Sequence, residues 1–444
     1  MKRRFFGTDG IRGKTGQHPI TPDFFVKLGF AAGKVLTENH KSKVNPSVVI
    51  GKDTRISGYM FESALEAGFS AAGVDTYLTG PLPTPGIAYL TQELESEIGV
   101  SITASHNPFD DNGVKFFTKN GEKISEAMEE KIEALMGEGI QSVSPDQLGK
   151  ARRLDEAQER YIRFCLNTVP KNFNFRKFKI VLDCAHGATY QVAPKVFKAL
   201  GIQTVVINNQ PDGLNINLNA GSTHPELLEK AVVEQKADLG LAFDGDGDRL
   251  IAVDSTGRII DGDEILYLIL NYFQKQKMLS GGLVGTLMTN LALEEKCKLW
   301  DIPFERANVG DRYVSEALRQ KKWQLGGENS GHIVMLNFHS TGDGIISALQ
   351  LLCALVAENQ SLQESLAGFS LYPQKLINVP IKEKMDLNSS HNQNLIKQAN
   401  EIMKGEGRVL IRPSGTQPLL RIMTEGPDAG LVEQSVQFLK ENLK

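Results

Sequence analysis

Residues 47–78 read SVVIGKDTRISGYMFESALEAGFSAAGVDTYL, and this stretch decides the fold class. It opens with the apolar, β-branched run 47–51, which favours a strand. Residues 59–72 carry apolar side chains at the spacing of one helix face, namely Phe61, Ala64, Leu65, Phe69 and Ala72. Gly73 ends this helix, and a second strand is expected over 74–78. A strand, a helix and a strand in this order predict the α/β class, with a parallel sheet covered by helices.

The same alternation continues along the chain, which at 444 residues is too long for one hydrophobic core. Residues 99–104 predict another buried strand, and the pattern restarts with a strand over 180–183 and again with a helix over 263–276. We predict three α/β domains with mixed sheets and a smaller C-terminal α+β domain. The predicted domains are residues 1–150, 151–255, 256–368 and 369–444.

Charge and composition exclude several classes of partner. The formal net charge is -4 and the hydrophobic fraction is 41%, so the chain is an ordinary globular protein without a global attraction to nucleic acid or anionic lipid. An anionic ligand must therefore be held locally. We expect neither a nucleic-acid partner nor a membrane partner.

The cysteines and the apolar stretches bear on the compartment. Cys165, Cys184, Cys297 and Cys353 are widely spaced, with no Cys-x-x-Cys pair, which fits a reducing compartment. The basic start is followed by Gly7 where the apolar core of a signal peptide would have to begin, and residues 348–357 are too short to span a bilayer. We therefore expect a cytoplasmic protein.

A run of alternating aspartate and glycine follows the predicted strand 239–243. Asp244, Asp246 and Asp248 place three carboxylates in five residues, and these groups repel one another unless a cation neutralises them. A calcium loop of the EF-hand type is excluded, because its sixth and twelfth positions here hold Arg249 and Ser255. Three acidic ligands leave positions that Mg²⁺ fills with water or phosphate oxygen, so the run indicates a magnesium site for phosphoryl transfer.

Ser105 lies at the carboxyl end of the strand predicted over 99–104, where open α/β sheets place their ligands. Before His106, Asn107 and Pro108, the chain turns sharply, and we expect the serine hydroxyl to be exposed at the sheet edge. A serine before a polar turn is common, so the segment alone is a weak signal. No Gly-x-Ser-x-Gly elbow surrounds it, and the adjacent His106 is not expected to turn back as its base. A metal-assisted phosphoserine is more consistent with this pattern than a hydrolase triad.

Two further loops carry polar groups suited to a phosphorylated sugar. Residues 412–416, Arg-Pro-Ser-Gly-Thr, and Arg421 suit a phosphate dianion, although a strand-to-turn connection with surface arginines is the plain alternative. Residues 326–332 mix acid, amide, hydroxyl and imidazole groups that suit sugar hydroxyls. His332 could equally be an ordinary loop histidine with satisfied hydrogen bonds.

Together and in this order, these segments resemble the α-D-phosphohexomutase superfamily over nearly the whole chain. The resemblance rests on seven segments: residues 6–13 (FGTDGIRG), 51–55 (GKDTR), 103–108 (TASHNP), 244–249 (DGDGDR), 309–312 (VGDR), 327–332 (GENSGH) and 412–416 (RPSGT). It implies four domains around a central cleft. One departure is Gln417, where family members commonly carry glutamate.

The resemblance also implies a role for each candidate site residue. Ser105 would be a phosphoserine and, with Asp244, Asp246 and Asp248, a ligand of one Mg²⁺ per subunit, with Arg249 beside them. Residues near the phosphoserine would be Arg12, His106 and Lys115, although by itself Lys115 predicts an exposed surface lysine. The sugar and distal phosphate contacts would be Glu328, Ser330, His332, Arg412, Ser414, Gly415, Thr416 and Arg421.

The activity implied is a phosphosugar mutase. Phospho-Ser105 would exchange phosphate with glucosamine 6-phosphate through a 1,6-bisphosphate to give glucosamine 1-phosphate, which feeds UDP-N-acetylglucosamine synthesis. Asp311 and Arg312 favour the amino sugar over mannose or glucose phosphates, which remain the alternative substrates, and a non-catalytic phosphosugar-binding protein is a further alternative. A kinase or autophosphorylation would first phosphorylate Ser105, and the protein would be a monomer or a homodimer.

Overall fold

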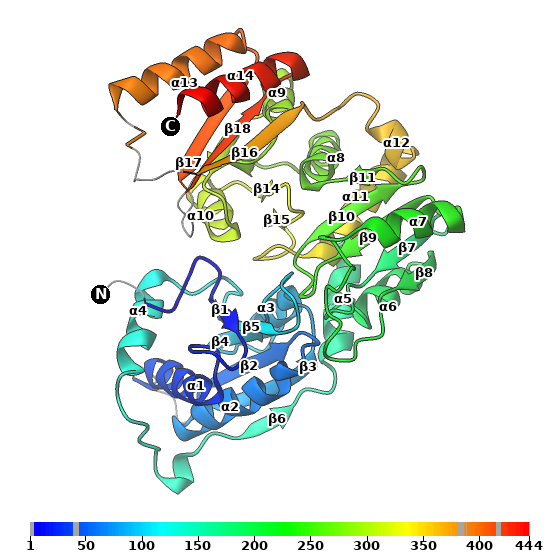
Figure 1. Ribbon diagram of the computed structural model, residues 1–444. Coiled ribbons are helices and arrows are strands. Elements are labelled where there is room, and N and C mark those ends of the chain that lie inside the picture. The colour runs from blue at the N-terminus through cyan, green and yellow to red at the C-terminus, as the bar shows by residue number, and fades with distance from the viewer. Residues whose placement is uncertain (1–3, 39–43, 381–385, 388, 414–418, 444) are drawn as a thin grey trace.

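The computed structural model describes residues 4–38, 44–380, 386–387, 389–413 and 419–443. These residues form four sheets, which we assign in chain order to domains I to IV. Figure 1 shows domain I and domain IV at opposite ends of the molecule, with domains II and III between them. The fold therefore agrees with the predicted α/β class and the smaller last domain.

Domain I contains a mixed six-stranded sheet in the order β1-β5-β4-β2-β3-β6. Because side chains alternate across a strand, Val48 and Ile50 of β2 pack in a core with α1 and α2, whereas Val49 joins a core that extends into domains II and III. The short strand β6 pairs with β3 just after residue 150. The elements are β1 (Ile11–Lys14), α1 (Pro22–Thr37), β2 (Ser47–Lys52), α2 (Ser57–Ala71), β3 (Asp75–Pro81), α3 (Thr84–Glu93), β4 (Ile98–Ile102), β5 (Asp111–Thr118), α4 (Glu126–Leu135), the 3-10 turn η1 (Pro145–Gln147) and β6 (Ala151–Arg153).

Domain II contains a five-stranded sheet in the order β11-β10-β9-β7-β8. Strands β7, β8 and β9 are parallel, and β10 returns antiparallel to β9. The aspartate run forms the connection between β9 and β10, a strand that was not predicted. The elements are α5 (Ala157–Asn167), β7 (Lys179–Asp183), α6 (Val192–Ala199), β8 (Gln203–Ile207), α7 (Glu226–Gln235), β9 (Leu239–Phe243), β10 (Leu250–Asp254) and β11 (Ile259–Ile260).

Domain III contains a four-stranded sheet in the order β13-β12-β14-β15. Its central strand β12 is parallel to both neighbours. Strands β14 and β15 are antiparallel and are connected by the loop of residues 328–332. The elements are α8 (Gly262–Lys275), β12 (Leu283–Thr286), α9 (Leu291–Leu299), β13 (Phe304–Ala307), α10 (Asp311–Lys321), β14 (Leu325–Gly327), β15 (Ile333–Met335), α11 (Gly344–Glu358) and α12 (Leu362–Ser365).

Domain IV has a three-stranded antiparallel sheet and a hydrophobic core of its own. It is attached to domain III through Arg408, which donates to the carbonyl oxygens of Leu287 at 2.9 Å and Thr289 at 2.8 Å. The elements are β16 (Gln374–Pro380), α13 (Ser390–Ile402), β17 (Arg408–Pro413), β18 (Leu419–Glu425) and α14 (Ala429–Asn442).

One feature is common to domains I, II and III. In each, a strand that is parallel to one neighbour is followed in the chain by an antiparallel strand, and the connecting loop carries a candidate site segment. These connections are β4 to β5 with Ser105, β9 to β10 with the aspartates, and β14 to β15 with Glu328. Equivalent loops of three related domains thus supply the polar groups.

The helices have a further property that bears on membranes. No helix among the described residues combines the length and the apolar character needed to cross a bilayer. Helix α11 is strongly apolar and is buried along most of its length, where it packs against α8 and the strands β9 and β10.

Candidate active site

Ser105 lies at the floor of the site, where the loop after β4 meets the aspartate loop of domain II. Ser105 is only 1% exposed, so the expectation of an exposed hydroxyl was wrong. The reason is tertiary: its Oγ donates to Asp244 Oδ2 at 2.7 Å, and a Cβ on Gly245 would lie 2.6 Å from the Ser105 carbonyl oxygen. Only a glycine allows the two loops to approach this closely.

A fully buried arginine holds the serine loop in place. Arg55 is 0% exposed, and it donates to the carbonyl oxygens of Ser105 at 3.0 Å and Asn107 at 2.9 Å, as well as to Pro108. Its charge is balanced by Asp53, 2.9 Å away. Since Ser105 adopts a left-handed backbone with φ +52°, which is uncommon for serine, these bonds stabilise an otherwise unfavourable turn.

The three aspartates converge as a metal site requires. One carboxylate oxygen from each lies within 4.8 Å of the others, and all three residues are buried. Among the described residues, Asp246 Oδ1 and Asp248 Oδ1 are buried without a hydrogen-bond partner. Unpartnered buried carboxylate oxygens fit a hard divalent cation such as Mg²⁺.

Electrostatics support the same interpretation. Burial, together with the charges of Asp248 and Asp246, raises the pKa of Asp244 well above its ordinary value. Burial also tends to raise the pKa of Asp248, but Lys115 and a hydrogen bond from His332 outweigh it and hold that pKa well below the ordinary value. A cation would relieve the repulsion that acts on Asp244.

Lys115 is a buried member of this cluster, 2% exposed, so the alternative of a surface lysine was wrong. Its Nζ lies 2.9 Å from Asp246 Oδ2 and 3.1 Å from Asp248 Oδ2. Burial tends to lower the pKa of Lys115, but the surrounding carboxylates raise it well above its ordinary value. Lys115 is therefore a permanent cation beside the aspartates.

Arg12 and Arg249 add positive charge near the serine. Arg12 pairs with Asp9, and the Arg249 backbone N–H donates to Asp244 Oδ1 at 3.2 Å. Both Nε atoms, with His332 Nε2, are buried donors that lack a hydrogen-bond partner among the described residues. Arg249 Nε is nevertheless ion-paired with Asp248 Oδ1, 3.9 Å away. Buried donors that still lack a hydrogen bond suit an anion such as a phosphoryl group.

His106 does approach the serine hydroxyl, contrary to expectation. Its Nδ1 lies 3.3 Å from Ser105 Oγ, because the chain leaves the strand in a left-handed turn at Ser105, whereas adjacent side chains of a continuing strand would point to opposite faces. Burial, then the charges of Arg249 and Arg12, lower the pKa of His106 to about 4. The imidazole is therefore neutral at pH 7.

The loop of residues 326–332, predicted to contact the sugar and called the sugar loop below, lies beside the aspartate cluster. Glu328 is buried, and its Oε1 accepts a hydrogen bond of 2.9 Å from the Gly310 N–H. His332 Nδ1 lies 3.7 Å from Asp248 Oδ2; burial lowers the pKa of His332, but Asp248 outweighs it and raises the pKa to about 9. Ser330, which lies between Glu328 and His332 in the sequence, is half-buried.

The segment predicted to bind the distal phosphate lies partly outside the described residues. Arg412 of β17 and Arg421 of β18 are direct cross-strand partners, so their side chains leave the same face of the sheet. Among the described residues, no hydrogen bond or ion pair joins either arginine to the aspartate cluster. The predicted contacts Ser414, Gly415 and Thr416, and the departure at Gln417, lie outside the described residues.

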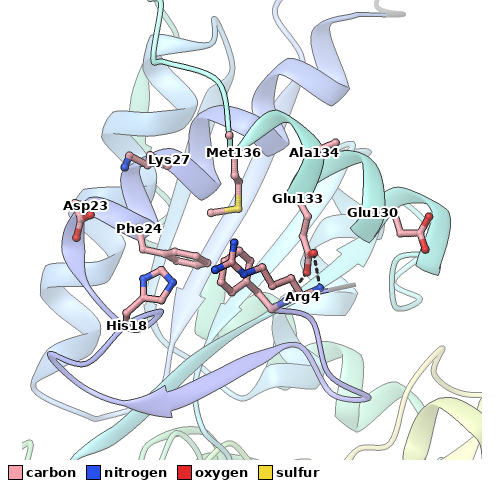
Figure 2. Close-up of a pocket in the computed structure, with 11 residues that line it drawn as sticks. Arg4, His18, Asp23, Phe24, Lys27, Glu130, Glu133, Ala134 and Met136 are labelled. Carbon is pink, nitrogen blue, oxygen red and sulfur yellow. Dashed lines mark hydrogen bonds between the residues drawn. The ribbon is translucent and has the colours of Figure 1, made fainter. Parts of the chain in front are cut away.

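A separate hollow of about 490 Å³ lies in domain I, away from this cluster. Figure 2 shows its wall of Phe24, His18 and Glu133 between α1, α4 and the N-terminal segment. The Glu133 carboxylate accepts from the backbone N–H groups of Arg4, Phe5 and Phe6 at 2.6 to 2.8 Å. None of the predicted site residues lines the hollow, and Glu133 anchors the chain that leads to residue 9.

Several residues that build the site were not predicted. Asp53 and Arg55 were noticed only as part of a resemblance, and Asn217, which donates to the Ser105 carbonyl oxygen at 2.9 Å, was missed. Thr84 Oγ1 lies 2.7 Å from Asp246 Oδ2 and was also missed. A usable signal existed for Lys115, because a lysine among the apolar residues of a strand with two buried faces requires a partner.

Comparison with known proteins agrees with this geometry. Models of the phosphoglucomutase/phosphomannomutase family match in order: alpha/beta/alpha domain I over residues 3–142, domain II over 159–257, domain III over 261–372 and the C-terminal domain over 376–441. The chain belongs to the phosphoglucomutase/phosphomannomutase family.

Individual relatives show which members of the family this chain is similar to. The chain is 54% identical to a phosphoglucosamine mutase of Methylobacillus flagellatus, over 98% of this chain and 97% of the relative. It is 55% identical to a phosphoglucosamine mutase of Chromohalobacter salexigens, over 96% and 95%. A phosphoglucomutase/phosphomannomutase family protein from Burkholderia thailandensis has the same fold, with a TM-score of 0.80 at 23% identity over 98% of this chain and 96% of that one.

Proposed function

We propose that this chain is a phosphoglucosamine mutase, an isomerase that interconverts glucosamine 6-phosphate and glucosamine 1-phosphate. The observation that carries the proposal is the position of the Ser105 hydroxyl, which lies 2.7 Å from Asp244, one of three converging aspartates that also contact the cations Lys115 and Arg249. Relatives of this name that share more than half of its residues support the choice of sugar.

The reaction needs Ser105 as a phosphoryl carrier. The bond between phosphorus and Ser105 Oγ breaks as a new bond forms to the 1-hydroxyl oxygen of glucosamine 6-phosphate, and the proton of that hydroxyl passes to Ser105 Oγ. The resulting 1,6-bisphosphate reorients within the site. Its 6-phosphoryl group is then transferred to Ser105, which leaves glucosamine 1-phosphate. Arg12 and Arg249 would stabilise charge on the moving group, and neutral His106 is able to accept a proton near Ser105.

We assign Mg²⁺ to Asp244, Asp246 and Asp248, with an oxygen of phospho-Ser105 as a further ligand. When bound, the ion would neutralise negative charge on the phosphoryl group. The buried Oδ1 atoms of Asp246 and Asp248, which accept no hydrogen bond from any described residue, support this assignment. Lys115 holds the two remaining Oδ2 atoms and so orients both carboxylates.

Substrate choice is open to direct measurement. We expect kcat/KM for glucosamine 6-phosphate to exceed the values for glucose 6-phosphate and mannose 6-phosphate on the same purified protein. A preference for either hexose would instead indicate a phosphoglucomutase or phosphomannomutase, and binding of all three sugars without conversion would indicate a non-catalytic phosphosugar-binding protein.

The remaining assignments follow from this activity. Glucosamine 1,6-bisphosphate would serve as intermediate and activator, and either a kinase or autophosphorylation would first load Ser105. We place the protein in the cytoplasm, where its four cysteines, all of them free and buried, would stay reduced. Its product would feed UDP-N-acetylglucosamine synthesis.

Arg412 provides a prediction for the distal phosphate. Since Arg412 and Arg421 leave the same sheet face, Arg412→Ala should lower kcat/KM for glucosamine 1-phosphate while phosphate on Ser105 stays detectable. A charge-assisted contact is worth about 1.5 to 3 kcal/mol, or roughly tenfold to over a hundredfold. Steady-state kinetics with catalytic bisphosphate would measure it.

The matched control for this experiment is Lys397→Ala, which removes an exposed cation from α13 of the same domain. Its kinetics should equal those of the wild type. An Arg412→Ala variant as active as this control would place Arg412 outside the working site.

A further inference from the structure

A row of alternating charges runs from domain III through domain I to the aspartate cluster. Asp311, the first residue of α10, has Oδ2 2.5 Å from Lys123 Nζ. Lys123 also pairs with Asp9, whose Oδ2 lies 3.3 Å from Lys115 Nζ. Lys115 in turn contacts two of the three metal-ligand candidates. The row therefore connects two domains to the metal cluster of a third.

The members of this row are shielded from solvent. The side chains of Lys123 and Asp311 are 16% and 14% exposed, and that of Asp9 is 27% exposed. Exposed ion pairs are weak because water and salt screen them, whereas partly buried pairs are screened less. The position of Lys123 therefore depends on both anions, and the position of Asp9 depends on the cations around it.

The domain III end of the row also meets the sugar loop. Gly310, next to Asp311, donates its N–H to Glu328 Oε1 at 2.9 Å. Gly310 has φ +127°, a conformation that favours glycine, so this peptide is directed at the carboxylate by the turn that begins α10. Two consecutive residues thus contact the sugar loop on one side and Lys123 on the other.

Resting on the proposed function, we propose that Lys123 and Asp311 are positioning residues that fix the sugar loop of domain III relative to Lys115 and the metal cluster. No hydrogen bond or ion pair among the described residues joins Lys123 or Asp311 to the aspartate cluster of residues 244, 246 and 248. Lys123 acts through Asp9, and Asp311 acts through Lys123 and through the loop that holds Glu328.

The physical reason is the balance of charge on Asp9. If a neutral residue replaced Lys123, the cations left beside Asp9 among the described residues would be Arg12 and Lys115. Asp9 would then attract both more strongly. Any movement of Lys115 toward Asp9 lengthens its contacts with the aspartates. A misplacement of a catalytic group by about 1 Å is enough to lower a rate about a hundredfold.

The test compares Lys123→Gln and Asp311→Asn with the wild type, using glucosamine 6-phosphate, Mg²⁺ and catalytic bisphosphate. We expect kcat/KM to fall roughly tenfold to a hundredfold, with kcat itself reduced in Lys123→Gln because Lys115 is misplaced. Lys123→Arg, which keeps the charge, should restore most of the loss. Asp9→Asn combined with Lys123→Gln should cost no more than the worse single change, since both act through one row.

The matched control is Arg319→Gln, which removes another ion pair between domains III and I. Arg319 Nε lies 2.8 Å from Glu122 Oε1, and neither residue belongs to the charge row. We expect Arg319→Gln to leave kcat and KM unchanged, and melting temperatures would show that all variants are folded.

Three outcomes would count against these ideas in different ways. Kinetics of Lys123→Gln and Asp311→Asn that match Arg319→Gln would overturn the positioning role alone. Equal losses in all three variants would show that the pair only docks the domains. A wild-type protein that does not convert glucosamine 6-phosphate would overturn the proposed function, and this inference with it.

Discussion

Ser105→Ala is expected to abolish mutase turnover, with a loss of at least roughly a thousandfold, because removing the nucleophile of a serine enzyme can cost about a millionfold. The fold should survive. The change removes one hydroxyl that donates to Asp244, which costs about 1 to 2 kcal/mol of unfolding free energy. Turnover and denaturant unfolding of the same preparation would measure both effects.

Ser435→Ala is the matched control for this variant. Ser435 is equally buried, and its hydroxyl donates to the Ala399 carbonyl oxygen at 2.9 Å in domain IV. It should lose similar stability but keep its turnover. Near-normal activity in Ser105→Ala would mean that another group carries the phosphoryl group.

Asp246→Asn is expected to raise the Mg²⁺ concentration needed for half-maximal activity by at least about tenfold and to lower the maximal rate. The substitution keeps the shape of the side chain but removes one of three anionic ligands, and it also weakens the contact with Lys115. Ca²⁺ should substitute poorly, because its larger and looser coordination shell holds a phosphoryl group less rigidly. Activity measured across a Mg²⁺ titration, with and without chelator, would show the change.

Asp301→Asn is the control for the metal prediction. Asp301 is an exposed aspartate in a left-handed turn, a conformation that asparagine also tolerates. Its Mg²⁺ dependence should equal that of the wild type. Full activity of the wild type in excess chelator would contradict the metal assignment.

Much of the fold was predictable because hydrophobic periodicity is local. The helix predicted over residues 59–72 is α2 at Ser57–Ala71, and the strand predicted over 239–243 is β9. Strand β10 was not predicted. Its apolar residues begin directly after the aspartate run, so no turn signal marks the start of a separate strand. The residues of β6 are all exposed, and a strand with no buried face has no periodic signal.

The site was predictable where residue chemistry is concentrated in a few positions. Three aspartates in five residues indicate a cation without any knowledge of the fold, and they do converge. By contrast, the burial of Ser105 depends on Gly245 of another domain, and the charge row depends on contacts between residues far apart in the chain, such as Lys123 and Asp311. A local sequence pattern does not indicate which distant residues will be in contact.

The central claim is that the phosphoryl group travels through Ser105. The most direct measurement follows phosphate on the Ser105 peptide by mass spectrometry while phosphorylated protein is mixed with glucosamine 6-phosphate and quenched at intervals. The account predicts that phosphate leaves Ser105 as glucosamine 1,6-bisphosphate appears, and returns as glucosamine 1-phosphate accumulates. Formation of glucosamine 1-phosphate with no phosphate on Ser105 at any time would contradict it.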